Sequence, residues 1–200
     1  MKKAAAKHNR WQDHYARRAK KEKFPARSVY KLQEMQQKYH LIKKGDKVLD
    51  LGCAPGSWLL YAANLTGSKG QVVGIDLKAM SERLPPHVRV YQSDLLFMDE
   101  ELFKLTGKDF NVVLSDMAPA TTGSKHVDSA RSFDLCRAAL SVAGETLVSG
   151  GSLVCKIFHG EDFKTFMDAV KQEFSRHKIF KPQSSRKASK EIYIIGLDKN

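Results

Sequence analysis

The stretch Asp50-Leu-Gly-Cys-Ala-Pro-Gly-Ser-Trp58 decides the fold of this 200-residue chain. It overlaps the end of an apolar run, Lys47-Val-Leu-Asp-Leu51, that is typical of a buried β-strand. The apolar segment that follows it predicts a helix from Trp58 to Leu65. A strand, a turn with two glycines and a helix, in this order, indicate an α/β unit whose helix begins at a ligand site.

The same alternation of strand and helix continues along the chain. Strands that alternate with helices predict a parallel sheet with helices on both faces. The last two strands have no helix between them, so we expect an antiparallel hairpin that places one of them beside the fifth strand. We therefore predict a three-layer, Rossmann-like α/β fold: a seven-stranded, mostly parallel sheet with an antiparallel C-terminal strand. The further predicted strands span 71–76, 88–91, 111–116, 151–158, 178–181 and 191–197, and the further helices span 128–148 and 162–174.

Two more helices are predicted before the first strand. The first is a basic helix over 10–23, which Phe24-Pro25 should end. The second covers 29–39, with Ser28 as its N-cap.

The positive charge of the chain is concentrated near its N-terminus. The chain has 34 Lys or Arg and 22 Asp or Glu, a net charge of +12, and residues 1–47 hold 15 of the former and 4 of the latter. A basic head on a nearly neutral body favours a nucleic acid partner. Trp11, Tyr15, Phe24 and Tyr30 lie among these charges and could stack on bases. A solvated basic tail is the alternative interpretation.

Several classes of protein and site do not fit the composition. No apolar run approaches the roughly 20 residues that cross a bilayer, and no apolar stretch follows the basic start, so we expect no membrane association and no signal peptide. The three cysteines are far apart, which argues against a zinc site or a disulfide framework, and the seven histidines show no metal-ligand spacing. We expect a monomeric protein of the cytosol.

The glycine turn also excludes two kinds of nucleotide site. Gly52 and Gly56 are separated as Gly-x-x-x-Gly, whereas a dinucleotide pyrophosphate calls for Gly-x-Gly-x-x-Gly. No Gly-Lys-Ser/Thr occurs, so the turn is not the phosphate-binding loop of a nucleoside triphosphatase.

Acidic residues follow the next two strands. Asp76 ends the second strand, 24 residues after Gly52, where one carboxylate can accept from both hydroxyls of a ribose. Asp94 follows the third strand and could accept from an adenine amino group. A glycine turn, an acid and a second acid describe an adenosine site without a pyrophosphate. This layout predicts S-adenosylmethionine as the cofactor.

Four charged residues from distant segments could meet at the same edge of the sheet: Lys31, Asp116, Lys156 and Glu191. Lys156 is the most informative, because it interrupts the apolar strand Leu-Val-Cys-Lys-Ile-Phe, from which a lysine is normally excluded. Such a group could accept or relay a proton from a hydroxyl during methyl transfer, with the two acids holding the lysine and Lys31 steadying the oxygen. Lys156 could instead act as an orienting cation.

Five motifs of the chain are similar to those of one protein family. They are Ala26-Arg-Ser-Val-Tyr-Lys-Leu32, Asp50 to Trp58, Leu114-Ser-Asp-Met-Ala-Pro119, Val154-Cys-Lys-Ile-Phe158, and Lys181-Pro-Gln-Ser-Ser-Arg186 with the following segment through Glu191. The chain resembles the FtsJ/RlmE ribosomal RNA 2′-O-methyltransferases over nearly its whole length. One departure is Ser57, where a third glycine is frequent in the family.

The resemblance implies an activity and assigns residues to it. It implies methylation of a uridine ribose in the A loop of 23S-type ribosomal RNA, on the large ribosomal subunit, with Lys156 as the proton acceptor. One domain is expected, with residues 1–46 as a basic RNA-binding extension and 47–200 as the catalytic core. The implied cofactor contacts are Gly52, Gly56, Trp58, Asp76, Asp94 and Asp116, and the expected RNA contacts are Arg10, Arg17, Arg18, Arg27, Lys31 and Arg186.

Other functions compete with this one. A base methyltransferase that acts on amino groups usually has an Asn/Asp-Pro-Pro-aromatic turn, whereas this chain has Asp116-Met-Ala-Pro119. A pyrimidine C5 methyltransferase needs a cysteine nucleophile, but Cys155 and Lys156 are strand neighbours and should point to opposite faces. The 2′-O-methyltransferases of transfer RNA or of messenger RNA caps, and an RNA-binding assembly factor, stay open as alternatives.

Overall fold

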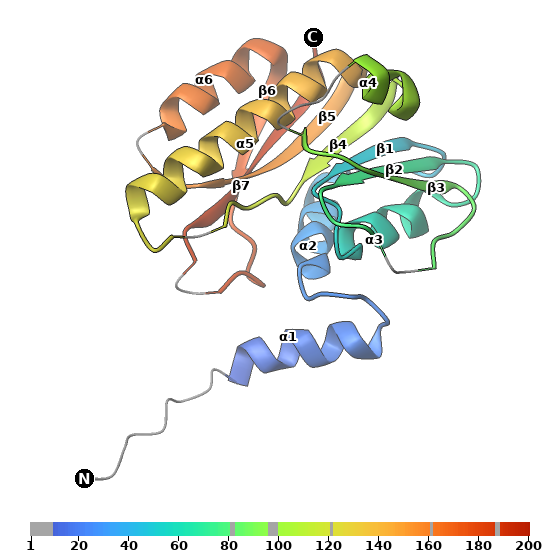
Figure 1. The fold of residues 1–200 in the computed structure, drawn as a ribbon, viewed down its shortest axis with the longest axis horizontal. Coiled ribbons are helices and arrows are strands. Elements are labelled where there is room, and N and C mark those ends of the chain that lie inside the picture. The colour runs from blue at the N-terminus through green and yellow to red at the C-terminus, as the bar shows by residue number, and fades with distance from the viewer. Residues whose placement is uncertain (1–9, 81–82, 96–99, 121, 161, 187–188) are drawn as a thin grey trace.

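A single seven-stranded sheet forms the centre of the molecule (Figure 1). The structure, a computed structural model, describes residues 10–80, 83–95, 100–120, 122–160, 162–186 and 189–200. The strands lie in the order β3-β2-β1-β4-β5-β7-β6, and β7 pairs antiparallel with both β5 and β6, whereas all other pairs are parallel. The predicted fold is confirmed, including the insertion of the last strand beside the fifth. The strands are β1 (Lys47–Leu51), β2 (Gln71–Asp76), β3 (Val88–Gln92), β4 (Phe110–Ser115), β5 (Leu147–Phe158), β6 (Phe174–Phe180) and β7 (Glu191–Lys199).

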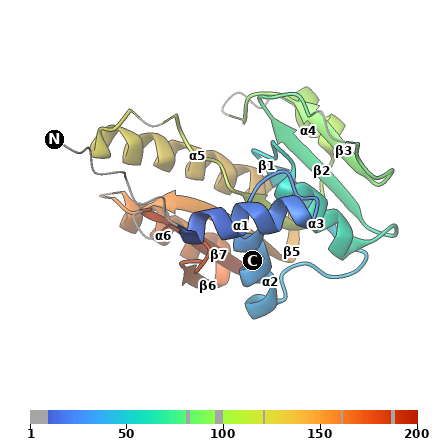
Figure 2. The same ribbon diagram turned by 90° about the horizontal axis from the view of Figure 1, so that it is seen from below.

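Helices cover both faces of this sheet (Figures 1 and 2). On one face, α2 and α3 bury residues such as Leu32 and Trp58 against the strands. On the other face, α4, α5 and α6 bury residues such as Ala139 and Phe166 in a second core. The helices are α1 (Arg10–Lys21), α2 (Val29–Tyr39), α3 (Ser57–Thr66), α4 (Glu100–Thr106), α5 (Lys125–Thr146) and α6 (Phe163–Glu173). None of the described helices is long and apolar enough to span a membrane.

Several local predictions differ from the structure. The helix predicted over 128–148 is α5 (Lys125–Thr146), and the strand predicted from 151 begins at Leu147, directly after that helix. The short helix α4 was not predicted, because its seven residues complete too few turns to show a helical period. Strand β6 begins at Phe174, directly after α6, and not at 178. Ser28 stands at the N-cap position of α2, but its backbone is helical (φ −59°, ψ −22°) and its side chain makes no capping hydrogen bond. The interpretation of Ser28 as a side-chain cap is therefore wrong.

The topology fixes where a ligand site can form. Strand β1 pairs with β2 on one side and with β4 on the other, so the chain leaves these strands in opposite directions. In open parallel sheets, ligands bind at this switch point, outside the carboxyl ends of the strands. Most of the side chains singled out from the sequence lie at this edge.

Candidate active site

The turn after β1 is shaped by its two glycines. Gly52 and Gly56 have φ values of +75° and +108°, a backbone region that residues with a side chain rarely adopt. A Cβ at Gly52 would lie 2.4 Å from Cγ of Met117, and one at Gly56 would lie 2.5 Å from Cε of Met80. Other residues are thus excluded by conformation and by space, and the turn can stay close to the edge of the sheet.

Asp76 holds this turn in place. Its Oδ2 accepts a hydrogen bond from the Ala54 N–H at 2.8 Å, and its Oδ1 accepts one from the Lys78 N–H, also at 2.8 Å. A carboxylate offers about four acceptor positions, so each oxygen keeps capacity for a ligand hydroxyl. The residue therefore can shape the turn and bind a ligand at the same time.

A cavity of about 280 Å³, hereafter the acidic cavity, opens between the ends of β1, β2, β3 and β4. Three carboxylates line it, which suits a ligand that carries hydroxyl or amino donors and positive charge. Four of the six predicted cofactor-binding residues take part in its wall, namely Gly52, Asp76, Asp94 and Asp116.

The other two predicted cofactor residues lie outside the wall of the acidic cavity. Gly56 is the N-cap of α3, and the Trp58 side chain is buried, with 3% of the residue exposed. The Trp58 indole N–H donates to the main-chain oxygen of Ser28 at 2.8 Å. What these residues can offer a ligand is the N–H groups of the first turn of α3.

Lys31, Asp116, Lys156 and Glu191, hereafter the tetrad, lie together although they come from four separate segments. Lys156 Nζ is 3.0 Å from Asp116 Oδ1 and also donates to the main-chain oxygen of Asp116. Lys31 Nζ is 2.9 Å from Glu191 Oε1 and 3.9 Å from Asp116 Oδ1. The exposed fractions of these side chains lie between 6% for Lys156 and 19% for Asp116, so the ion pairs are largely shielded from water.

Tyr193 contacts the tetrad and was missed by sequence reasoning. It is fully buried, and its hydroxyl donates to Asp116 Oδ1 at 2.5 Å. Burial raises the pKa of Tyr193 well above its ordinary value, and the charges of Asp116 and Glu191 raise it further, so the hydroxyl stays protonated. Tyr193 is paired with Lys156 across the strands and is two residues from Glu191. The period of two along a strand could have indicated that Tyr193 and Glu191 share a face.

A second contact that sequence reasoning missed is made by Ser57, the residue that stands where a third glycine is frequent in the family. The Ser57 hydroxyl accepts from the Ala26 N–H at 2.7 Å and donates to the Ala26 oxygen at 3.1 Å. A glycine at this position could make neither bond. Ser57 therefore ties the start of α3 to the segment that leads into α2, and so helps to place Lys31.

Asp50 lies in β1, just before the glycine turn, and forms no ion pair among the residues that the structure describes. It is 1% exposed, and its Oδ2 has no hydrogen-bond partner among the described residues. Burial raises the pKa of Asp50 well above its ordinary value, and the nearby Asp116 and Asp76 raise it further. The acidic cavity therefore adjoins a carboxyl group that is held in its neutral form over a wider pH range than usual.

The predicted RNA-binding arginines divide into two groups. Arg17 and Arg18 are exposed on α1, where the Arg18 guanidinium pairs with Glu22 and lies 4.6 Å from the centre of the Tyr30 ring. The side chain of Arg10 lies outside the described residues. Arg27 is half-buried and donates to the Ser184 oxygen at 2.5 Å, which connects α2 to the loop before β7.

The same loop is held at a second point. Both carboxylate oxygens of Glu34 accept from its main chain, from the Gln183 N–H at 2.6 Å and from the Ser184 N–H at 2.8 Å. Arg186 is exposed on this loop, and its charge helps to lower the pKa of Arg27, although burial is the larger cause. Arg27 and Arg186 thus form one positive region near Lys31.

Cys53, Cys136 and Cys155 are buried and free. Cys155 belongs to the core on the α5 side of the sheet, whereas Tyr193, the cross-strand partner of Lys156, belongs to the core on the α2 side. The thiol therefore faces away from the tetrad and is not placed to attack a substrate there.

Comparison with known proteins agrees with this geometry. The model of the family described as FtsJ-like methyltransferase matches residues 24–199. A protein of Desulforapulum autotrophicum named ribosomal RNA large subunit methyltransferase E is 58% identical over 193 residues, which are 96% of this chain and 95% of that protein. A protein of the same name from Desulfosudis oleivorans is 52% identical over 199 residues, 100% of this chain and 96% of the relative. Among solved structures, a Plasmodium falciparum protein described as a ribosomal RNA methyltransferase superposes with a TM-score of 0.77 at 27% identity, covering 88% of this chain and 98% of the other.

Proposed function

The chain belongs to the FtsJ-like methyltransferase family, and from this premise we propose that it methylates the 2′-hydroxyl of a uridine ribose in 23S-type large-subunit ribosomal RNA, with S-adenosylmethionine as the donor. The observation that carries the proposal is the tetrad, in which two lysine side chains and two carboxylates lie within ion-pair distance and one carboxylate, that of Asp116, also lines the acidic cavity. Asp116 belongs to both, so the reacting oxygen and the methyl donor would meet at this residue.

The polar groups of the acidic cavity and of the first turn of α3 fit S-adenosylmethionine. Asp76 would accept from the ribose hydroxyls, Asp94 from the adenine amino group, and the first turn of α3 would receive the carboxylate of the methionine part. The negative charge of Asp116 suits a positively charged sulfur. When bound, the cofactor would supply a methyl group on a sulfonium, and an oxygen that attacks this methyl in line would displace the sulfur as a neutral thioether.

The tetrad would prepare the ribose oxygen for this attack. Lys156 Nζ is assigned the role of proton acceptor from the 2′-hydroxyl, and the Asp116 carboxylate and main-chain oxygen hold this amino group in place. Lys31 stabilises the negative charge that develops on the oxygen, while Glu191 keeps Lys31 in position. Tyr193 fixes the Asp116 carboxylate through its hydrogen bond, so this carboxylate does not rotate away from Lys156.

The ribosomal substrate is inferred from the relatives and from the charge of the chain. The curated relatives named above are ribosomal RNA large subunit methyltransferases, and they match over nearly their whole length. Residues 1–46 would bind RNA and residues 47–200 would form the catalytic core of one domain, although α2 also packs on the sheet and supplies Lys31. We propose a monomer that acts on the large ribosomal subunit in the cytoplasm, with Arg10, Arg17, Arg18, Arg27 and Arg186 among its RNA contacts.

The proposal is tested by transfer of a labelled methyl group from S-adenosylmethionine to large ribosomal subunits that lack the modification. The modified nucleoside is identified by mass spectrometry for the wild type and for Lys156→Ala. Lys164→Ala, an exposed lysine of α6, is the matched control. We expect 2′-O-methyluridine in large-subunit RNA with the wild type and the control, and none above background with Lys156→Ala.

Each other result would replace the proposal by a named alternative. A methylated base would assign the chain to the base methyltransferases. Label on transfer RNA or capped RNA, but not on subunits, would move the substrate within the 2′-O class. RNA binding without any methyl transfer would indicate an assembly factor.

A further inference from the structure

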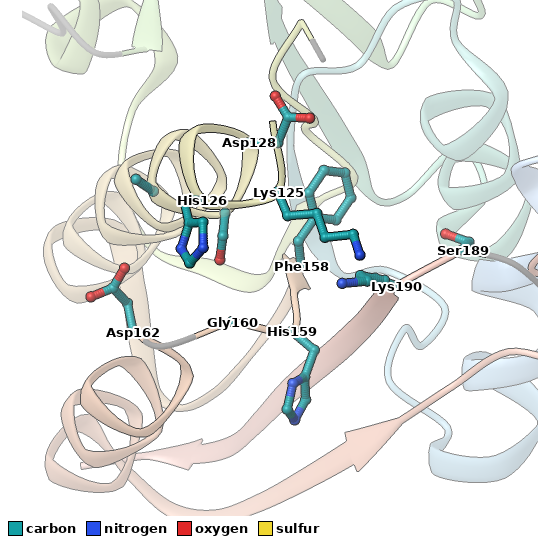
Figure 3. Close-up of a pocket in the computed structure, with 11 residues that line it drawn as sticks. Lys125, His126, Asp128, Phe158, His159, Gly160, Asp162, Ser189 and Lys190 are labelled. Carbon is teal, nitrogen blue, oxygen red and sulfur yellow. The ribbon is translucent and has the colours of Figure 1, made fainter. Parts of the chain in front are cut away.

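A second and larger cavity lies beside the tetrad. It has a volume of about 560 Å³, within the range of ligand pockets in proteins. Its wall is formed by the first turn of α5, the end of β5 with the residues that follow it, and the two residues that precede β7 (Figure 3). We call this cavity the side pocket. None of the residues assigned so far to catalysis, cofactor or RNA lines it.

The side pocket and the tetrad share one pair of strands. Phe158, in the wall of the pocket, is the cross-strand partner of Glu191, and Lys190 directly precedes Glu191. Phe158 lies two residues beyond Lys156, which corresponds to roughly 7 Å along a strand. The pocket is therefore near enough to a ribose held by Lys156 to receive a neighbouring nucleotide of the same strand.

The chemistry of the wall is that of a site for a nucleotide. Figure 3 shows the side chains of Lys125 and Lys190 directed toward the same part of the pocket, close to the ring of Phe158. In the part of the chain that the structure describes, neither lysine forms an ion pair with a carboxylate. Two ammonium groups would hold a phosphate, and an aromatic ring supplies a surface on which a base can stack.

The opposite side of the pocket offers groups for the edge of a base. Asp162 and His126 line it there (Figure 3). A carboxylate accepts from the N–H groups of a base, so the pocket is polarised between a cationic side and a side that can read a base. The second carboxylate in the wall, Asp128, already accepts hydrogen bonds from the Thr122 and Gly123 N–H groups, which compensate its charge.

The wall is built to keep the pocket open. A Cβ at Gly160 would lie 1.8 Å from Ser129 Oγ, so only glycine lets the segment after β5 lie against α5 here. The ring of His159 stacks on Phe163, with 5.2 Å between ring centres and an angle of 20°, and this contact orients His159. The cavity is thus formed by backbone and by packed rings, not by exposed side chains alone.

We propose that the side pocket binds one unstacked nucleotide of the substrate RNA, next to the nucleotide whose ribose lies against Lys156. Lys125 and Lys190 contact its phosphate, and its base stacks on Phe158. The inference rests on the proposed function for the identity of the strand, and it adds a site that holds this strand in register with the tetrad.

The test compares two double variants that remove the same charge. Lys125→Ala with Lys190→Ala removes the cationic side of the pocket. Lys44→Ala with Lys69→Ala removes two exposed lysines next to the amino ends of β1 and β2, at the opposite edge of the sheet. The dissociation constant for a 23S-type ribosomal RNA transcript is measured at several KCl concentrations. Each lost phosphate contact should reduce the slope of log K against log salt by about 0.7, so about 1.4 for the pocket variant and none for the control.

A second variant tests whether a base stacks on Phe158. Phe158→Leu keeps an apolar side chain but removes the stacking surface, and we expect its RNA affinity to fall about fivefold or more. Transcripts that contain 4-thiouridine should form photocrosslinks to Phe158 or His159 in the wild type. These crosslinks should be lost with the pocket double variant and kept with the control.

Two results would overturn the proposal. Equal salt slopes for both double variants, with no crosslink to the pocket, would show that RNA does not enter it. Normal transcript binding by the pocket variant, together with weaker binding of whole large subunits, would assign the pocket to a ribosomal protein. Methyl transfer by the wild type, measured in the same preparation, reports on the proposed function independently of either result.

Discussion

The two halves of the carboxyl edge of the sheet hold different sets of charged side chains. The half beside β1, β2 and β3, hereafter the acidic half, has mostly carboxylates, whereas the half beside β5 and β7, hereafter the basic half, has lysines together with carboxylates. Beside β1, β2 and β3, Asp76 and Asp94 line the acidic cavity without a lysine of the tetrad. Beside β5 and β7, Lys156 and Lys31 gather with the lysines of the side pocket. Asp116 lies where the halves meet, in the wall of the acidic cavity and in contact with Lys156.

One edge of the sheet could therefore bind two partners of opposite charge. The acidic half suits a cationic methyl donor, and the basic half suits an RNA strand. The carboxylates of the acidic half would attract the cationic donor, and the lysines of the basic half would contact the phosphates of RNA, so each partner has its own side of Asp116. Substitutions in one half should then affect one partner and spare the other.

The largest effect is expected from Lys156→Arg, at the centre of the basic half. Arginine keeps the positive charge and can still pair with Asp116, but it does not lose its proton in proteins. We expect kcat for methyl transfer to fall about 10²- to 10⁴-fold, the usual contribution of a general base, with S-adenosylmethionine affinity unchanged. Single-turnover rates and calorimetric binding measure the two quantities. An arginine variant with near wild-type kcat would make Lys156 an orienting cation.

Asp76→Asn tests the binding of the methyl donor in the acidic half. The amide keeps one acceptor oxygen but replaces the other by an NH₂ group, which cannot accept from the Ala54 or Lys78 N–H. Loss of a charged hydrogen bond costs about 1.5–3 kcal/mol, so S-adenosylmethionine should bind about 10- to 100-fold more weakly. Affinity for the RNA transcript should not change. A parallel loss of RNA affinity would contradict the separation of the two halves.

The junction of the halves is tested by Tyr193→Phe. The ring still fills the core, but Asp116 loses the hydrogen bond that holds its carboxylate. We expect kcat to fall about tenfold, because the positioning of Lys156 is relaxed, while both partners bind as before. Tyr39→Phe, in a half-buried tyrosine of α2, is the matched control and should leave kcat unchanged. A normal kcat for Tyr193→Phe would remove this residue from the proposed mechanism.

The smallest effect is expected from Asp50→Asn, which should change how the stability of the folded protein depends on pH. Its pKa is raised in the folded protein, so between the ordinary pKa of about 3.9 and the raised value the folded state binds a proton that the unfolded state lacks. The free energy of unfolding must therefore decrease as the pH rises through this range. Asp50→Asn removes this dependence, because an amide does not titrate.

Thermal unfolding measures this difference. We expect the Tm advantage of Asp50→Asn over the wild type to grow between pH 5 and pH 8, by about 2–4 °C for each kcal/mol. Asp168→Asn, at an exposed aspartate of α6 that pairs with Lys171, should keep the wild-type trend. Parallel Tm curves for the wild type and Asp50→Asn would show that Asp50 is ionised in the folded protein.

The sheet, the glycine turn and the four residues of the tetrad could be predicted from the sequence. Each of these depends on a local pattern: an apolar run, two glycines at a fixed spacing, or a lysine in a strand that should exclude it, such as Lys156. The topology then follows from rules that apply to every parallel sheet, which is why Asp76 and Asp116 could be assigned to one edge.

The further side chains that complete the site became visible only in the folded protein. The contacts of Tyr193 with Asp116 and of Ser57 with Ala26 join segments that are 77 and 31 residues apart, and the side pocket needs α5, β5 and β7 at once. Packing of this kind depends on the distance between elements and on side-chain rotamers. No periodicity along the chain records either quantity, since a pattern describes which face of an element is buried and not what it is buried against.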